Sequence, residues 1–116
     1  MGSALAAAVA ALVVPLFATD SAIRISEIAA APANPQAGVP LVVSARIQFE
    51  GTPGSIHCSA RAGGQKVRSV RLTWESSIAR CSLMVPRRAA GRSLTVTLRA
   101  QSGGNRARQT LGFRVN

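Results

Sequence analysis

The chain has 116 residues, a formal net charge of +10 and only four acidic side chains. This length allows one ordinary domain, and four scattered carboxylates leave little material for a paired-carboxylate catalytic site. With three Phe, one Trp and no Tyr, the sequence also lacks the aromatic platforms on which single-stranded bases stack. The basic excess instead indicates attraction to polyanions such as nucleic acid, anionic wall polymers or acidic lipid, or simply a surface of solvated charges.

Residues 1–22 have the composition of a signal peptide or hydrophobic leader. The run ALAAAVAALVVPLFA at 4–18 carries no charge. It is shorter than the roughly 20 residues that span a bilayer, and its length is typical of a secretory apolar region. However, no basic residue precedes the run and no clear A-x-A site follows it. A buried Ala-rich helix and a membrane anchor are the alternatives. We expect an apolar, signal-like helix that precedes a domain at 23–116.

From Ile23 onward, apolar residues alternate with polar ones, which is the period of a strand with one buried face. Outward positions often hold arginine, as at Arg46, Arg80 and Arg99, and this placement supports the register. The pattern predicts antiparallel sheets packed on one core. Seven segments show it: AIRIS at 22–26, LVVSARIQF at 41–49, SIHCSARA at 55–62, SVRLTW at 69–74, ARCSLMV at 79–85, SLTVTLRA at 93–100 and RARQTLGFRV at 106–115.

Glycine and proline residues separate these segments. Gly63-Gly64 lies at the spacing of a two-residue hairpin, where a type I′ turn needs positive φ at both positions, and Gly103-Gly104 repeats the pattern. About seven short strands with frequent turns predict an all-β sandwich without a helix of ordinary length in the domain. Other loops are expected at APANPQAGVP (31–40), GTPG (51–54) and PRRAAGR (86–92).

Three local features follow one another along residues 23–116. They are Pro35-x-Ala37-Gly38, the series Cys58-x-Ala60-x-x-Gly63-Gly64, and Val85-Pro86 followed by Ala89-x-Gly91-Arg92. Together with the order of the turns, they resemble the bacterial immunoglobulin-like (Big-type) domains of secreted and surface proteins. The resemblance implies an immunoglobulin-like antiparallel β-sandwich with a non-catalytic role in adhesion, spacing or carbohydrate contact. Antibody domains have a longer spacing between their cysteines, so a bridge in this chain would join different strands.

Cys58 and Cys81 are the only cysteines, and both have the inward parity of their segments. An exported chain meets an oxidising compartment, so we predict a disulfide between them. Closing this loop would stabilise the fold by about 3.4 kcal/mol in the chain-entropy model. In a reducing compartment the pair would be two buried thiols.

Other chemistry has little support in the sequence. His57 and Cys58 are adjacent on one strand and point to opposite faces, so they cannot easily form a nucleophilic pair. A zinc site needs three or four suitably spaced ligands, and no C-x-x-C motif occurs. Trp74 is either a stacking platform for a sugar or base, or a core or semi-exposed residue that packs against the bridge. We therefore expect no enzyme activity, metal or cofactor.

The candidate polyanion-binding residues lie in or beside three predicted loops. If these loops meet at one end, they form a patch that binds polyanions in a salt-dependent way and without sequence choice; otherwise the charges are simply solvated. The residues are Lys66 and Arg68 after the first Gly-Gly turn, Arg87, Arg88 and Arg92 in one loop, and Arg106 and Arg108 after the second turn.

Together these features predict an exported, non-catalytic module for adhesion, spacing or binding, secreted or held at the cell surface. Its expected partner is a surface protein or a polysaccharide. The alternative function is a basic protein that binds nucleic acid or an anionic wall polymer, without a specific nucleic-acid site. Contact with a membrane is expected only through an uncleaved leader.

Overall fold

The computed structural model of the protein describes residues 22–116. The predicted leader helix and the run at 4–18 lie outside the described residues. Within 22–116 there are eight strands and one short 3-10 helix: β1 (Ile23–Ala31), β2 (Pro40–Phe49), β3 (Ser55–Ala62), β4 (Gln65–Lys66), β5 (Arg71–Glu75), β6 (Ile78–Met84), η3 (Arg87–Ala89), β7 (Ser93–Ser102) and β8 (Asn105–Arg114).

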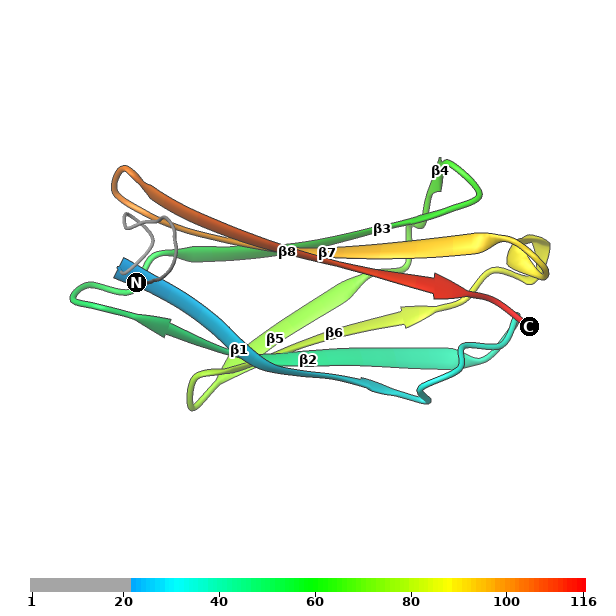
Figure 1. Cartoon of the computed structure of the whole chain (residues 1–116), viewed down its shortest axis with the longest axis horizontal. Coiled ribbons are helices and arrows are strands. Elements are labelled where there is room, and N and C mark those ends of the chain that lie inside the picture. Colours follow the sequence, from blue (N-terminus) through cyan, green and yellow to red (C-terminus); the bar gives the residue numbers. More distant parts are fainter. Residues whose placement is uncertain (1–21) are drawn as a thin grey trace, which may run out of the picture.

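The strands form two four-stranded sheets that pack face to face (Figure 1). Their orders are β1-β2-β6-β5 and β4-β3-β7-β8, and every strand pair is antiparallel. An immunoglobulin sandwich has the same arrangement, with strands A, B, E and D opposite C, F and G. In this chain β4 is an additional short edge strand. The predicted all-β, immunoglobulin-like sandwich is therefore confirmed.

The core lies where the alternating pattern predicted it. Inward residues of β2, β6 and β7 are almost completely buried, and no polar or charged side chain among the described residues is buried. Two residue pairs, Val43 with Cys81 and Ala45 with Ala79, lie opposite each other in neighbouring strands. The largest buried side chains are Leu41, Ile47, Leu94, Leu98, Val43, Val85, Val96 and Val115.

Most strand boundaries lie within one or two residues of the prediction, and three differences concern the course of the chain. β1 continues to Ala31, past a β-bulge where Glu27 has φ of 50°. The segment SVRLTW forms a strand only from Arg71, because the chain crosses from one sheet to the other before that residue. Gln65 and Lys66 pair with β3 and make the eighth strand. Alternation alone does not mark a strand of two residues.

The two Gly-Gly turns close hairpins as predicted. Gly63 and Gly64 have φ of +57° and +85°, the positive values that a type I′ turn needs at both positions. In the second hairpin only Gly103 has a left-handed φ, of +59°. Ser102 and Asn105 pair across this turn, so it also joins two strands directly.

Trp74 has the inward parity of β5 but lies near the end of the sandwich, where it is 36% exposed. Its ring meets the ring of Phe49 edge-on, with centroids 5.6 Å apart. This geometry is favourable for aromatic pairs. Of the two interpretations of Trp74, the structure therefore favours a semi-exposed packing residue. Its aromatic packing partner is Phe49, whereas the sequence suggested the disulfide bridge.

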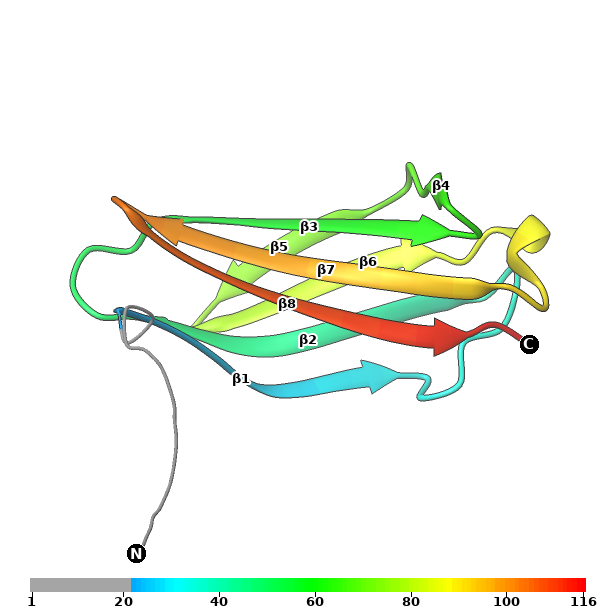
Figure 2. The same ribbon diagram turned by 45° about the horizontal axis from the view of Figure 1, so that its top comes forward.

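The described residues measure 51 × 34 × 21 Å along their principal axes. β1 begins at one end of the long axis, and the C-terminus lies at the opposite end (Figure 2). The β7–β8 turn lies at the end where β1 begins, whereas the β3–β4 turn and η3 lie toward the C-terminal end (Figure 1). Residues 22–116 contain no helix long and apolar enough to cross a membrane.

Candidate polyanion-binding surface

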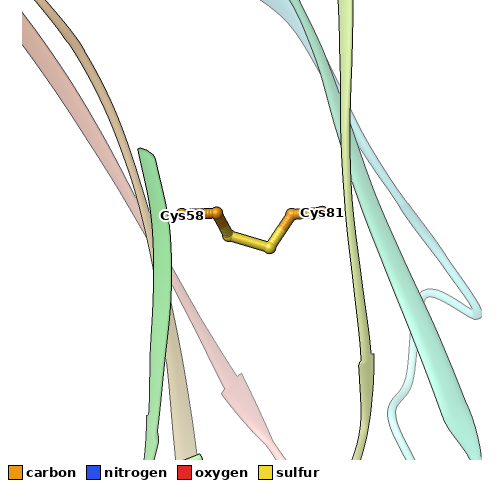
Figure 3. The surroundings of a disulfide bond; sticks show 2 residues. All are labelled: Cys58 and Cys81. Carbon is orange, nitrogen blue, oxygen red and sulfur yellow. A yellow bond between two sulfur atoms is a disulfide. The ribbon is translucent and has the colours of Figure 1, made fainter. Parts of the chain in front are cut away.

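Cys58 and Cys81 form a disulfide bond that links the two sheets (Figure 3). Their Cα atoms are 6.2 Å apart. Cys58 lies in β3 and Cys81 in β6, and Cys81 is completely buried. An antibody domain joins strands B and F, which correspond to β2 and β7. The bridge is therefore present as predicted, and it does join a different pair of strands.

The disulfide uses the sulfur that a Cys–His pair would need. His57 lies on the exposed side of β3, whereas Cys58 points between the sheets. Among residues 22–116, no three His, Cys, Asp or Glu side chains are grouped closely enough to hold a metal ion.

The structure does not bring the seven candidate basic residues together in one patch. Lys66, Arg88 and Arg92 lie toward the C-terminal end of the molecule, around the β3–β4 turn and η3 (Figure 1). Arg106 and Arg108 begin β8 at the opposite end, and Arg68 lies in the crossover to β5. The side chain of Arg87 lies close to Gly38. A Cβ atom placed on Gly38 would be 3.5 Å from the Cγ atom of Arg87.

The arginines near the β3–β4 turn bond to neutral groups of the protein. Arg88 Nε donates to Gln65 Oε1 over 2.9 Å, and an Arg61 guanidinium nitrogen donates to the carbonyl oxygen of Gly64 over 2.7 Å. The side chain of Arg92 covers Gly63, where a Cβ atom would come within 2.9 Å of its Cδ. The contacts of Arg88 and Arg92 hold the loop of η3 against the β3–β4 turn, whereas the Arg61 bond lies within the β3–β4 hairpin.

A second basic group lies on the outer face of β3, β7 and β8, near the β7–β8 turn. We call His57, Arg99, Arg106 and Arg108 the outer arginine cluster. The pairing register places Arg99 directly opposite both His57 and Arg108, while Arg106 is opposite Gln101. All four side chains are exposed. They line an open hollow of about 620 Å³ together with Ala100, Gln101 and Ala107.

The outer arginine cluster has no acidic partner among residues 22–116. The one ion pair among residues 22–116 joins Arg46 Nε to Glu27 Oε2 over 3.0 Å, on the other sheet. No side-chain hydrogen bond within the described part of the chain involves Arg99, Arg106 or Arg108. Like charges directly opposite each other destabilise a sheet. Within the described part of the chain, the cluster thus combines positive charge that no carboxylate neutralises with N–H donors that no side chain accepts from, which is the chemistry that binds phosphate, sulfate or carboxylate.

Sequence reasoning found Arg106 and Arg108 but missed His57 and Arg99 as members of this surface. Arg99 was assigned only to the outward parity of its strand, and His57 to a solvent-side position. The signal lies in the register of β7 against β3 and β8, which brings residues 57, 99 and 108 into one row.

No family model matches the sequence, and no curated protein matches it. The solved structures that are similar in fold include three structures of titin domains, and the alignment covers almost all of each. Titin M4 in a trigonal crystal form has a TM-score of 0.57 at 12% identity, over 81% of this chain and 95% of its own. The M1 domain from titin has a TM-score of 0.54 at 12% identity, over 82% and 95%.

The third is a chimeric titin Z1Z2 functionalized with a KLER exogenous peptide from decorin. Its TM-score is 0.51 at 18% identity, over 82% of this chain and 97% of its own. Identities this low concern the fold alone. Together with the strand order, the three structures show that residues 23–116 form an immunoglobulin-like β-sandwich.

Proposed function

We propose that the chain is an exported, non-catalytic immunoglobulin-like module that binds, adheres or acts as a spacer at the cell surface. The observation that carries this proposal is the covalent bridge between the two sheets of an elongated sandwich. β1 starts at one end of the long axis and β8 ends near the other (Figure 2). Such a module separates whatever is attached at its two ends, and a disulfide persists in oxidising compartments.

Mass spectrometry of the chain recovered from the outside of expressing cells tests this proposal. We expect a mass that lacks the leader and is about 2 Da below that of the reduced form, because the disulfide removes two hydrogen atoms. Recovery of the chain only inside cells, with an intact leader and two thiols that react with iodoacetamide, would contradict it. A Cys58→Ala/Cys81→Ala variant is the control for the mass difference.

The outer arginine cluster favours a second candidate function, the binding of polyanions. Its charges have no acidic neighbours among the described residues, so an external anion is the partner that would neutralise them. Titration with DNA and with an anionic wall polymer at several salt concentrations tests this function. We expect binding that weakens steeply as salt rises, since each neutralised charge releases counterions. An absence of binding to both polymers at about 20 mM salt would refute it.

A further inference from the structure

The outer face of β3, β7 and β8 is composed entirely of basic, hydroxyl, amide and glycine residues. Alternate residues of each strand point away from the core. None of these outward residues is acidic or aliphatic, and the imidazole of His57 is the one aromatic ring among them. Along the three strands they are Ser55, His57, Ser59 and Arg61 in β3, Ser93, Thr95, Thr97, Arg99 and Gln101 in β7, and Arg106, Arg108, Thr110, Gly112 and Arg114 in β8.

The pairing register divides this face into three zones along the strands. The outer arginine cluster forms one end. A hydroxyl zone follows, in which Ser59, Thr97 and Thr110 lie side by side, and the Oγ1 atoms of the two threonines are 3.4 Å apart. Arg61, opposite Thr95, and Arg114, opposite Ser93, form the other basic end. Thr95 and Arg99 are four positions apart along β7, and at about 3.3 Å per position this is roughly 13 Å.

This order of charge and hydroxyl groups selects a particular ligand chemistry. Guanidinium groups bind phosphate or sulfate in a bidentate manner, and threonine hydroxyls both donate to and accept from the hydroxyls of a sugar or polyol. Apart from the imidazole of His57, the face has no aromatic side chain on which a base could stack, whereas proteins that bind single strands use several such side chains. It also has no apolar residue that could enter a lipid layer. Nucleic acid and membrane are therefore poorer partners for this face.

Building on the second candidate function, we propose that this face binds a linear, hydroxyl-rich polymer that carries phosphate or sulfate esters. The chain of the polymer lies along the strands. One ester group occupies the hollow of the outer arginine cluster, a later one reaches Arg61 and Arg114, and the intervening sugar or polyol units contact Thr97 and Thr110.

The test compares matched variants of the full, oxidised chain in their binding to immobilised polymers. Arg99→Gln/Arg108→Gln removes two charges from the cluster. Arg71→Gln/Arg80→Gln removes two charges from exposed positions of the other sheet and is the control. The probes are a heparin oligosaccharide, which carries sulfate, and poly(glycerol phosphate), which carries phosphate. The polymer that binds more tightly identifies whether the face prefers sulfate or phosphate esters.

We expect the cluster variant to lose at least about tenfold in affinity at 50 mM salt, and its slope of log affinity against log salt to fall by about 1.4. The control should lose less than about threefold. Because the substitutions remove like charges from exposed positions, both variants should fold. Equal losses in the two variants would overturn the proposed site while leaving polyanion binding intact. If the unaltered chain bound no polyanion at all, the underlying function would itself fail.

A second pair of measurements tests the hydroxyl zone. Thr97→Val/Thr110→Val keeps the shape of both side chains but removes their hydroxyls. We expect this variant to bind poly(glycerol phosphate) or heparin at least about threefold more weakly, and to bind inorganic polyphosphate, which has no hydroxyl-bearing units, as the unaltered chain does. If this variant lost as much affinity for polyphosphate as for the hydroxyl-rich polymers, the role assigned to the two threonine hydroxyls would be overturned. Tighter binding of oligo-dT than of both hydroxyl-rich polymers would overturn the ligand class.

Discussion

At the scale of single residues, the bridge between Cys58 and Cys81 has the clearest effect on stability. The two sulfurs close a loop within one small domain, which loses conformational freedom in its unfolded state as a result. Cys81 is completely buried in the core and Cys58 packs against the same cluster. Their removal therefore affects both the unfolded chain and the packing between the sheets.

We predict that Cys58→Ala/Cys81→Ala lowers the free energy of unfolding by about 3 kcal/mol. Urea unfolding monitored by circular dichroism measures the difference. The unaltered chain in excess reductant is the control, and it should unfold near the same urea concentration as the variant. A variant within about 1 kcal/mol of the oxidised chain would show that the bridge contributes little.

His57 and Arg99 show why residue patterns alone identified only part of the candidate site. Parity correctly gives Arg99 an exposed position on β7, and it also gives exposed positions to arginines on other strands, such as Arg80 on β6. Membership of one cluster depends on which residues of β3 and β8 lie opposite Arg99. Partner strands and their register are set by packing over the whole domain, so two members of the cluster could not be found from local sequence.

At the scale of elements, the β5–β6 hairpin has an unusual turn. Glu75 pairs with Ile78, so Ser76 and Ser77 form a two-residue loop, with φ of 50° and 68°. Both values are left-handed, and such turns normally use Asn-Gly. A non-glycine residue in this region costs on the order of 1 kcal/mol or more. The turn is nevertheless anchored, because the carbonyl of Ser77 accepts from the N–H of Ile47 over 2.8 Å.

We predict that Ser76→Asn/Ser77→Gly raises the free energy of unfolding by about 1 kcal/mol, because these residues adopt positive φ more readily. The bond to the Ile47 N–H uses the backbone and is retained. Thermal and urea unfolding measure the gain. Ser76→Val/Ser77→Val provides the opposite control, since β-branched residues fit this region poorly, and should be less stable than the unaltered chain. A destabilised Asn-Gly variant would disprove the strained-turn interpretation.

Alternation predicted most of the strands because this sandwich has one buried face per sheet. Leu41, Val43, Ala45 and Ile47 are all buried, as their spacing indicates. The short β4 and the crossover after Lys66 were not predicted. A two-residue strand has no period, and no local property of residues 67–70 specifies to which sheet the next strand belongs. The length of β1 was underestimated because a bulge at Glu27 shifts its parity.

At the scale of the whole molecule, positive charge is largely uncompensated. The chain carries 14 basic and four acidic residues, and its described part contains one ion pair. Self-repulsion of this kind destabilises a compact state. Added salt shortens the reach of each charge to about 10 Å at 0.1 M, so it relieves the repulsion between neighbours such as Arg99 and Arg108.

We predict that an increase in sodium chloride from about 20 mM to 300 mM raises the melting temperature by roughly 3 °C, as a gain of about 0.5 kcal/mol would in a domain of this size. Differential scanning calorimetry of the oxidised chain measures the shift. Arg99→Gln/Arg108→Gln should melt higher than the unaltered chain at low salt and respond less to added salt. A melting temperature that falls with salt would indicate that attractive ion pairs dominate.

The position of the bridge also has a mechanical consequence. A force applied at the two ends of the described domain pulls on β1 and β8, which are edge strands of opposite sheets. Unravelling from either side stops at Cys58 and Cys81, because the 22 residues between them stay in a closed loop. At about 3.5 Å per extended residue, the intact bridge prevents roughly 75 Å of extension under force. The reach of the stretched module therefore depends on the redox state of its surroundings.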